Sequence, residues 1–128
     1  MTINTAGEES LFAAHHQKIG FQFALKGIKW ALYNQVNVKI HLYVIVLVVI
    51  LGLITQLQTI EWLFIISAIF SVLITEMLNT SIEQATDAVT KKFDTTIGLS
   101  KDLAAGAVLL SALYASIIGI IIFIPKII

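Results

Sequence analysis

One stretch of the chain combines acidic and amide side chains at helical spacing and continues a strongly apolar run. Glu76, Asn79, Glu83 and Asp87, here called the polar stripe, follow directly on the apolar residues 62–74. At about 100° per residue, their spacings of three, four and four place them in a sector of roughly 80° on one helix. A carboxylate at membrane depth is costly, so it usually faces protein, a cavity or a cation. The polar stripe is therefore the first candidate for chemistry.

These side chains could divide the work of phosphoryl transfer. That reaction needs a metal ion and a cation at the phosphates and a base that orients the acceptor. Magnesium takes oxygen ligands, typically one or two carboxylates together with substrate phosphates. Lys101 and Asp102, just ahead of the last apolar run, could supply a phosphate-binding cation and a second acidic group. The sequence has no GxxxxGK[ST] loop, which excludes a P-loop kinase.

Two other interpretations of the polar stripe remain open on physical grounds. Glu83 and Asp87 could be solvated residues at a helix end, because Asp87 and Lys91 at i,i+4 attract each other. Glu76 is harder to explain in this way, because it follows directly on the apolar run. It could instead be the carrier carboxylate of an ion- or proton-translocating membrane subunit. Such a subunit would need neither Lys101 with Asp102 nor a stripe that continues beyond the span.

The composition defines the class of protein. Of 128 residues, 58% are hydrophobic and 12% are charged, whereas a soluble domain is nearer a quarter charged. The sequence therefore indicates an all-α integral membrane protein. The formal net charge is zero and there is no basic patch, so we expect no nucleic-acid partner. Cysteine is absent, which excludes disulfides, thiolate metal sites and a cysteine nucleophile.

Three apolar runs are long enough to cross a bilayer as helices, at about 40–60, 62–90 and 101–124. The second is predicted to be ~45 Å long at 1.5 Å per residue, so its acidic end should pass the hydrocarbon core and reach water. Pro125 and Lys126 are expected to end the third span. That span also carries a face of small residues, which predicts close packing against another helix: Ala104, Ala107, Ser111, Ala115 and Gly119.

Ahead of the spans, residues 18–35 predict an amphipathic helix that lies on the membrane surface, although a soluble core helix would show the same periodicity. We expect residues 1–17 to form a partly flexible N-terminal segment and residues 18–128 to form the membrane domain. Because lysines gather on the cytoplasmic side of a membrane, the polar stripe should be cytoplasmic. The lysines of that side are Lys18, Lys26, Lys29, Lys39, Lys91, Lys92 and Lys101, against Lys126 on the other.

The spacing Glu76-x-x-Asn79-x-x-x-Glu83-x-x-x-Asp87, joined to the downstream Lys101-Asp102, resembles the small prokaryotic diacylglycerol kinase family, which includes undecaprenol kinases. Residues 23–27 and 37–41 also fit its pattern, so the resemblance runs from about residue 18 to residue 125. It implies a homotrimer in the bacterial inner membrane, with cytoplasmic active sites shared between chains. It also implies transfer of phosphate from ATP, with Mg²⁺, to a lipid hydroxyl. We expect diacylglycerol as the acceptor, with undecaprenol as the alternative.

The resemblance assigns a role to each matching residue. Glu76 would be the general base on the lipid hydroxyl, and Glu83 would bind the metal ion. Gln35 stands where many members have a second metal-binding glutamate, so it could ligate the metal without adding charge. The remaining residues would lie at the nucleotide: Asn79, Lys92, Phe93, Asp94, Lys101 and Asp102.

Overall fold

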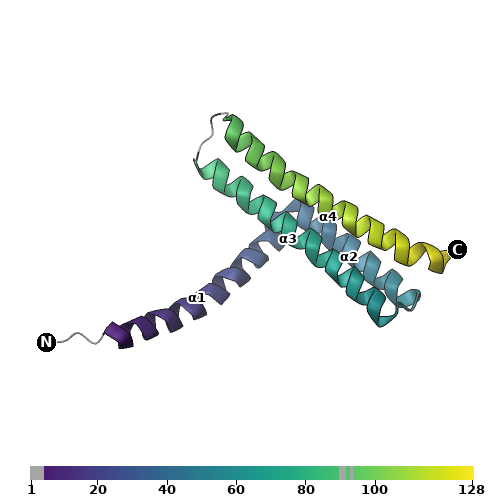
Figure 1. Ribbon diagram of the computed structural model, residues 1–128, viewed down its shortest axis with the longest axis horizontal. Helices are drawn as coiled ribbons and strands as arrows, with labels where there is room; N and C mark the ends of the chain where they lie inside the picture. Colours follow the sequence, from purple (N-terminus) through teal and green to yellow (C-terminus); the bar gives the residue numbers. More distant parts are fainter. Residues whose placement is uncertain (1–4, 90–91, 93) are drawn as a thin grey trace. The chain divides into compact units, whose positions relative to one another are not determined.

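The computed structural model describes residues 5–89, 92 and 94–128, with side chains from residue 20 onward. Within these residues there are four helices and no strand, which confirms the predicted all-α class. The helices are α1 (Thr5–Asn34), α2 (Val36–Ile54), α3 (Thr59–Val89) and α4 (Thr95–Ile127), as labelled in Figure 1. The chain divides into two compact units, residues 1–35 and residues 36–128.

The first unit consists mainly of α1. The helix starts at Thr5 and runs without a break to Asn34, so it includes much of the predicted N-terminal segment 1–17 as well as the predicted surface helix 18–35. Side chains 20–30 are all exposed, and Lys26 Nζ lies 5.4 Å from the centre of the Phe23 ring. The orientation of this helix on a membrane surface stays a prediction.

In the second unit, α2, α3 and α4 run up, down and up. A tight turn over residues 55–58 joins α2 to α3, and Gln56 adopts a left-handed backbone with φ of 52°. The Leu57 N–H donates to Gly52 O (3.1 Å), which closes the end of α2. The Gln58 N–H donates to Glu61 Oε2 (2.7 Å), so a side chain satisfies one of the free donors at the start of α3.

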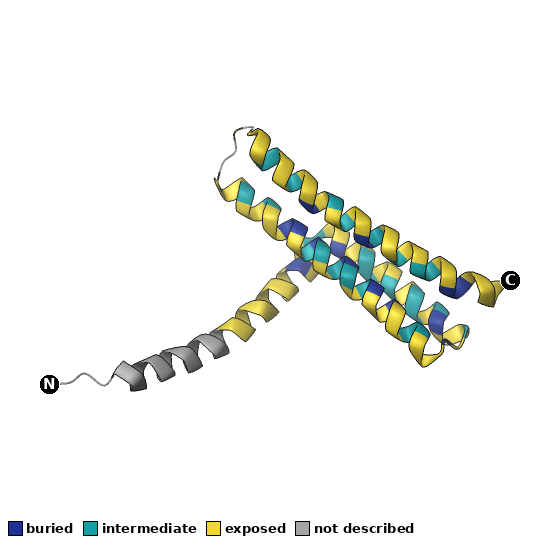
Figure 2. Ribbon diagram, viewed as in Figure 1, coloured by how far each residue is buried: buried dark blue, intermediate teal, exposed yellow. Residues whose placement is uncertain are grey.

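The helices pack closely beside this turn. A Cβ atom added to Gly52 would lie 2.7 Å from Trp62 Cη2, so a glycine is what allows the ring to lie against α2. A small apolar core continues from there across α3 and α4. Its buried members are Leu57, Ile65, Ile122 and Phe123. In Figure 2 the buried positions form a narrow line on facing sides of the helices, while most of the surface is exposed.

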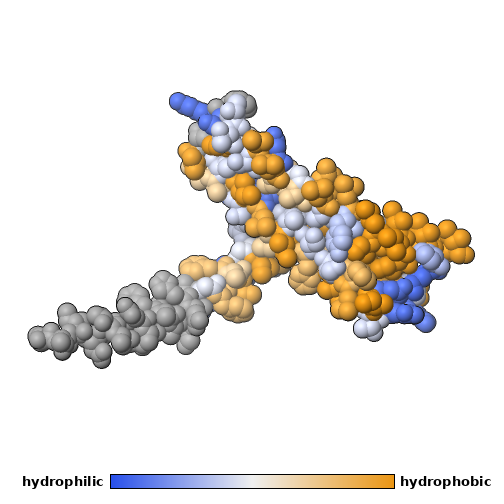
Figure 3. Space-filling view, in the orientation of Figure 1, coloured by the Kyte–Doolittle hydropathy of each residue, from blue (hydrophilic) through white to orange (hydrophobic). Residues whose placement is uncertain are grey.

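The exposed surface of residues 36–128 is mostly apolar. Orange side chains cover much of the face in Figure 3, and hydrophilic ones gather towards both ends of this unit. All three helices α2, α3 and α4 are long and apolar enough to cross a membrane, as predicted. At 1.5 Å per residue, α2 is about 28 Å long, which matches a hydrocarbon core of about 30 Å. The helices α3 and α4 are about 46 and 50 Å long and therefore extend beyond it.

Both ends of α4 differ from the prediction. The helix begins at Thr95, because Asp94 caps it by accepting hydrogen bonds from the Thr96 and Ile97 N–H groups (2.8 and 3.1 Å). The prediction that Pro125 and Lys126 end the span is wrong, since the helix runs on to Ile127. Pro125 cannot donate to the preceding turn, but the Ile128 N–H bonds to Ile124 O at 3.2 Å, so the helix continues past the proline.

Candidate active site

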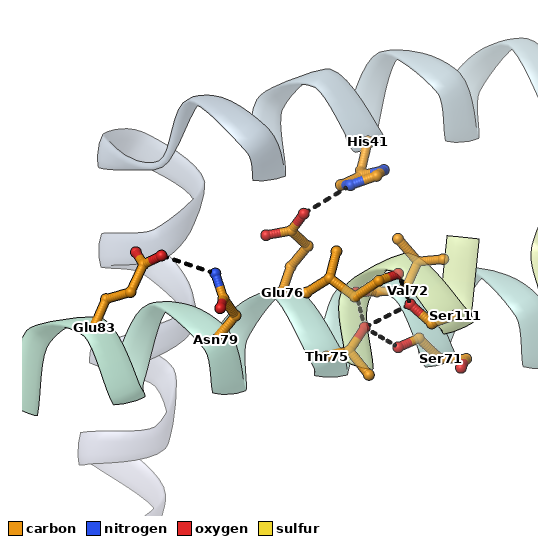
Figure 4. Close-up of polar contacts among 9 residues, drawn as sticks. His41, Ser71, Val72, Thr75, Glu76, Asn79, Glu83 and Ser111 are labelled. Atoms are coloured by element: carbon orange, nitrogen blue, oxygen red, sulfur yellow. Dashed lines mark hydrogen bonds and ion pairs between the residues drawn. The ribbon is translucent and has the colours of Figure 1, made fainter. Parts of the chain in front are cut away.

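Glu76 is buried in the interior of the second unit and has a partner on another helix. Its side chain is 5% exposed, and its Oε1 lies 3.1 Å from His41 Nε2 on α2 (Figure 4). Burying an isolated ionised carboxylate in such a place would cost several kcal/mol of desolvation free energy. The imidazole contact offsets part of this cost. The sequence prediction that Glu76 faces protein, a cavity or a cation is consistent with this contact.

The lengths of the helices explain why the two side chains meet. Glu76 lies about 26 Å along α3 from Thr59, and His41 lies about 8 Å into α2 from Val36. Because α2 and α3 are antiparallel and α2 is about 28 Å long, both residues fall just inside the end of α2 that begins at Val36. Later residues of α3 extend past this end. The apolar slab is here the layer over which α2, α3 and α4 lie side by side. Glu76 therefore lies at the edge of the apolar slab rather than at its centre.

One turn further along α3, Asn79 and Glu83 form the next polar contact. Asn79 Nδ2 donates to Glu83 Oε1 at 3.2 Å (Figure 4). Asn79 is buried, and its Oδ1 has no hydrogen-bond partner among the described residues. Buried polar atoms are nearly always satisfied, so an open acceptor beside a carboxylate points to a ligand or to water. Glu83 is half-buried, and its hydrogen bond to Asn79 uses one of its two oxygens, Oε1.

The outer part of the polar stripe meets α4. Lys101 Nζ lies 2.5 Å from Asp87 Oδ1, although Asp87 remains 63% exposed. An ion pair this open contributes little to stability because solvent screens it. Its effect is on position, since it keeps the Lys101 ammonium beside the polar stripe. Asp102 is exposed next to it on α4.

Hydroxyl groups hold α3 and α4 together along the span. Thr75 Oγ1 and Ser111 Oγ are 2.7 Å apart, and Ser67 Oγ and Tyr114 Oη are 3.1 Å apart. Ser111 is buried, and it belongs to the small-residue face predicted on the third span. These contacts join α3 to α4 on a different side of α3 from the one that carries the Glu76 contact to His41 (Figure 4).

Two hollows border the site. The first is an apolar groove of about 460 Å³ between α2, α3 and α4, and His41 and Val72 line the end nearest Glu76. The second, of about 620 Å³, lies between α3 and α4 and is lined in part by Asn79, Thr86 and Ser100. An apolar groove on one side of the carboxylate and a more polar hollow on the other can serve a lipid and a polar reactant.

The remaining predicted residues are placed as follows. Lys92 is exposed after α3, and Asp94 is the cap of α4. Phe93 lies outside the described residues. Gln35 ends the first unit, where its N–H donates to Ala31 O (3.0 Å). Its role as a metal ligand stays a prediction.

The side chains present fit a magnesium ion held mainly by its substrate. Within the described residues, no group of three or more His, Asp and Glu side chains could hold a metal ion. Magnesium does not need such a cage, because it uses one or two carboxylates and substrate phosphates. Glu83 and the open Asn79 Oδ1 are hard oxygen donors one turn apart on one helix.

The sequence pattern assigned His41 no function of its own. It lies within residues 37–41, which fit the family pattern. The signal was available, because a histidine at the start of an apolar span is itself a costly polar group that needs a partner. The spacing within one helix could identify the polar stripe, but it could not say which helix lies opposite.

Comparison with known proteins identifies the family. Residues 22–123 match the model of the prokaryotic diacylglycerol kinases. The chain is 37% identical to an undecaprenol kinase of Bacillus subtilis over 106 residues, which cover 83% of this chain and 86% of that protein. It is 32% identical to a diacylglycerol kinase of Synechocystis over 84% of this chain and 62% of that protein. A diacylglycerol kinase of Escherichia coli is 26% identical over 74% of this chain and 78% of that protein.

These matches favour the kinase prediction over an ion-translocating subunit and agree with the three apolar helices. The protein is a membrane-embedded lipid kinase that uses ATP, and the chain belongs to the prokaryotic diacylglycerol kinase family.

Proposed function

We propose that this chain transfers the γ-phosphoryl group of ATP to the hydroxyl of a membrane lipid, with diacylglycerol as the first candidate acceptor. The observation that carries the proposal is the buried Glu76 carboxylate at the edge of the apolar slab, with Glu83 further along the same helix. A lipid hydroxyl lies at the depth of Glu76, and a nucleotide lies in water near Glu83. The two reactants can thus meet along one side of α3.

Glu76 acts as the general base. One of its oxygens faces His41, and the other takes the proton of the lipid hydroxyl. The lipid oxygen forms a bond to the γ-phosphorus, and the bond from that phosphorus to the bridging oxygen breaks. The electron pair leaves with ADP. Because such a transition state is loose, most of the acceleration comes from positioning and from charge stabilisation.

Magnesium would be held by Glu83, with Asn79 beside it, and the family resemblance adds Gln35 as a second candidate ligand. When bound, the ion neutralises charge on the β- and γ-phosphates. Glu83 Oε1 accepts from Asn79, which orients the carboxylate and leaves Oε2 for the ion. Gln35 would bring an amide oxygen without negative charge, so it would bind magnesium less tightly than a glutamate.

Lys101 and Asp102 contact the nucleotide in this proposal, together with Lys92, Phe93 and Asp94. The support is the position of Lys101, whose ammonium is kept at the polar stripe by Asp87. A lysine in this place can move to an incoming phosphate, because it leaves only an exposed ion pair. Asp94 already caps α4 through one oxygen, so its contact to the nucleotide would use the other.

We further propose a homotrimer in the bacterial inner membrane, with active sites on the cytoplasmic side that neighbouring chains share. The lysine distribution supports the orientation. The thin core supports assembly, because three helices leave most of their apolar surface open and bury few residues. Chemical cross-linking of purified protein in mild detergent would test the trimer, and a monomer under all conditions would contradict it.

Purified protein, labelled ATP and one lipid at a time test the reaction. We expect label in diacylglycerol when Mg²⁺ is present and none when a chelator removes it. Glu76→Gln is the matched control, because it keeps the size of the side chain and removes the base. If no lipid alcohol were labelled by the wild-type protein, the proposed function would be wrong.

Undecaprenol is a second candidate acceptor. The Bacillus subtilis relative, which is 37% identical, is named for that lipid, whereas the 32% identical relative is named for diacylglycerol. Both lipids present a hydroxyl at the interface, so the Glu76 chemistry is the same for each. The ratio of kcat/KM for the two lipids in one detergent decides between them.

A further inference from the structure

We propose that His41 is the positioning residue of Glu76, holding the carboxylate in the orientation in which it accepts the proton of the lipid hydroxyl. This inference rests on the proposed function and adds a residue to it. The starting observation is the contact of 3.1 Å between His41 Nε2 and Glu76 Oε1, which joins α2 to α3 at the edge of the apolar slab.

The contact has a defined donor when Glu76 is ready to act. An ionised carboxylate only accepts hydrogen bonds, so His41 Nε2 must carry the hydrogen. The bond then occupies Oε1 and leaves Oε2 for the substrate. A free glutamate has several rotamers of similar energy, and a donor from a facing helix selects one of them. In this way α2 determines where the base points.

The surroundings give Glu76 few other constraints. His41 is the hydrogen-bond partner that the described residues provide for Glu76, and the neighbouring Thr75 turns to Ser111 on α4 instead. The side chain of Glu76 is 5% exposed and that of His41 is 26% exposed, so solvent screens the contact only in part. A hydrogen bond in such a place is stronger than one in water. Loss of His41 would leave a buried carboxylate without its donor.

The apolar groove makes the position of His41 relevant to substrate. His41 lines the groove of about 460 Å³, and the other lining residues on α2, α3 and α4 are non-polar except for Ser116. It is therefore the polar group at which an apolar groove meets the base. A hydroxyl that reaches this end of the groove would find Glu76 already oriented. Positioning of this kind acts on kcat more than on the binding of ATP.

Three substitutions of His41 separate positioning from packing. His41→Phe keeps a ring of similar shape and removes the donor, whereas His41→Gln keeps an N–H near the place of Nε2. We expect kcat for lipid phosphorylation to fall at least about 10-fold in His41→Phe, with KM for ATP changed less than about 2-fold. His41→Gln should recover most of the loss. His41→Ala opens space for free imidazole, which should raise its kcat if a donor is what is missing.

Ser111→Ala is the control for structural damage. It removes a buried hydrogen bond of 2.7 Å between α3 and α4, next to Glu76 in sequence but on the other side of the helix. We expect it to lower thermal stability and to leave kcat per folded protein unchanged. The outcome that overturns the inference is a kcat in His41→Phe within about 2-fold of wild type, or an equal loss of kcat in Ser111→Ala.

Each remaining outcome also supports or contradicts the role of His41. If His41→Phe does not fold, the imidazole response of His41→Ala replaces it, and no response to imidazole contradicts positioning by a donor. A folded His41→Gln that is as inactive as His41→Phe contradicts it too. A wild-type protein that labels no lipid removes the proposed function and this inference together, whereas active His41 variants remove this inference alone.

Discussion

The two ends of α3 are held against the other helices by different kinds of interaction. At its start, Trp62 lies against Gly52 and an apolar core joins α2, α3 and α4. In its second half, the buried groups are Glu76, Asn79 and Thr80. The first end is held by close apolar packing, and the second by hydrogen bonds and an exposed ion pair. One continuous helix therefore has a region that stabilises the fold and a region whose polar groups are available for the proposed reaction.

The difference can be seen in what each end leaves unsatisfied. At the packed end, Glu61 accepts from the Gln58 N–H at 2.7 Å and from Lys126 Nζ at 3.1 Å. At the polar end, Asn79 Oδ1 is buried without a partner among the described residues. Stable packing leaves no such group, whereas a site that waits for a ligand must leave some. The comparison predicts that substitutions at the polar end change activity and that those at the packed end change stability.

Glu76→Gln should have the largest effect on activity. The amide keeps the volume of the side chain but cannot take a proton, and a general base contributes about 10²- to 10⁴-fold to a rate. We expect labelled transfer to lipid to fall by at least about 10²-fold while nucleotide binding, measured by equilibrium titration, is largely kept. Near-normal turnover would mean that Glu76 is not the base.

Glu83→Gln should have the next largest effect, and on binding rather than on chemistry alone. The substitution removes the negative charge that attracts Mg²⁺ and keeps an oxygen, so we expect metal-dependent nucleotide binding to weaken by about 10- to 100-fold. Titration of nucleotide at several Mg²⁺ concentrations measures the change. Gln35→Glu is the complementary variant and should leave activity intact or tighten Mg²⁺. If nucleotide binding by the wild-type protein did not depend on Mg²⁺, the assignment of Glu83 as a metal ligand would be wrong.

Most of the fold followed from the sequence, because each span is a long apolar run and such a run can only be a helix in a bilayer. The ends of the helices were less predictable. Asp94 caps α4, so this helix starts at Thr95. Pro125 does not end it, because the Ile128 N–H still bonds to Ile124 O. Capping residues determine where such helices begin and end, and several residues near each boundary could have acted as the cap.

The polar stripe followed from spacing on one helix, which is a local property. Contacts between helices did not follow in the same way. The pairing of Glu76 with His41 depends on the length of the 55–58 turn and on the antiparallel register that Gly52 and Trp62 set. Likewise, the sequence did not predict that Asp87 meets Lys101 on α4. The partner that the spacing suggested, Lys91, lies outside the described residues. Register between helices is determined by packing far from the site.

Gly52→Ala should reduce stability and leave chemistry intact. The new methyl group would lie 2.7 Å from Trp62 Cη2 and 3.0 Å from Leu57 Cδ1, and overpacking of this kind costs about 1–3 kcal/mol. Thermal inactivation in detergent measures the loss. Gly106→Ala is the matched control, because no heavy atom lies within 4 Å of the added Cβ and the helix should be as stable or more so. A fall in kcat of folded Gly52→Ala would mean that the packed end also aligns the site.

Lys126→Gln should have the smallest effect, and it makes the sharpest comparison. Both ion pairs join α3 to α4, Lys126 to Glu61 at the packed end and Lys101 to Asp87 at the polar end. Salt screens such pairs, so we expect a small loss of thermal stability in Lys126→Gln that disappears at high ionic strength, with kcat unchanged. Each pair joins a lysine to a carboxylate, and the pairs differ in their neighbours and in their exposure, which is greater at the polar end. If Lys126→Gln lowered kcat as much as Lys101→Gln does, location along α3 would not separate stability from activity.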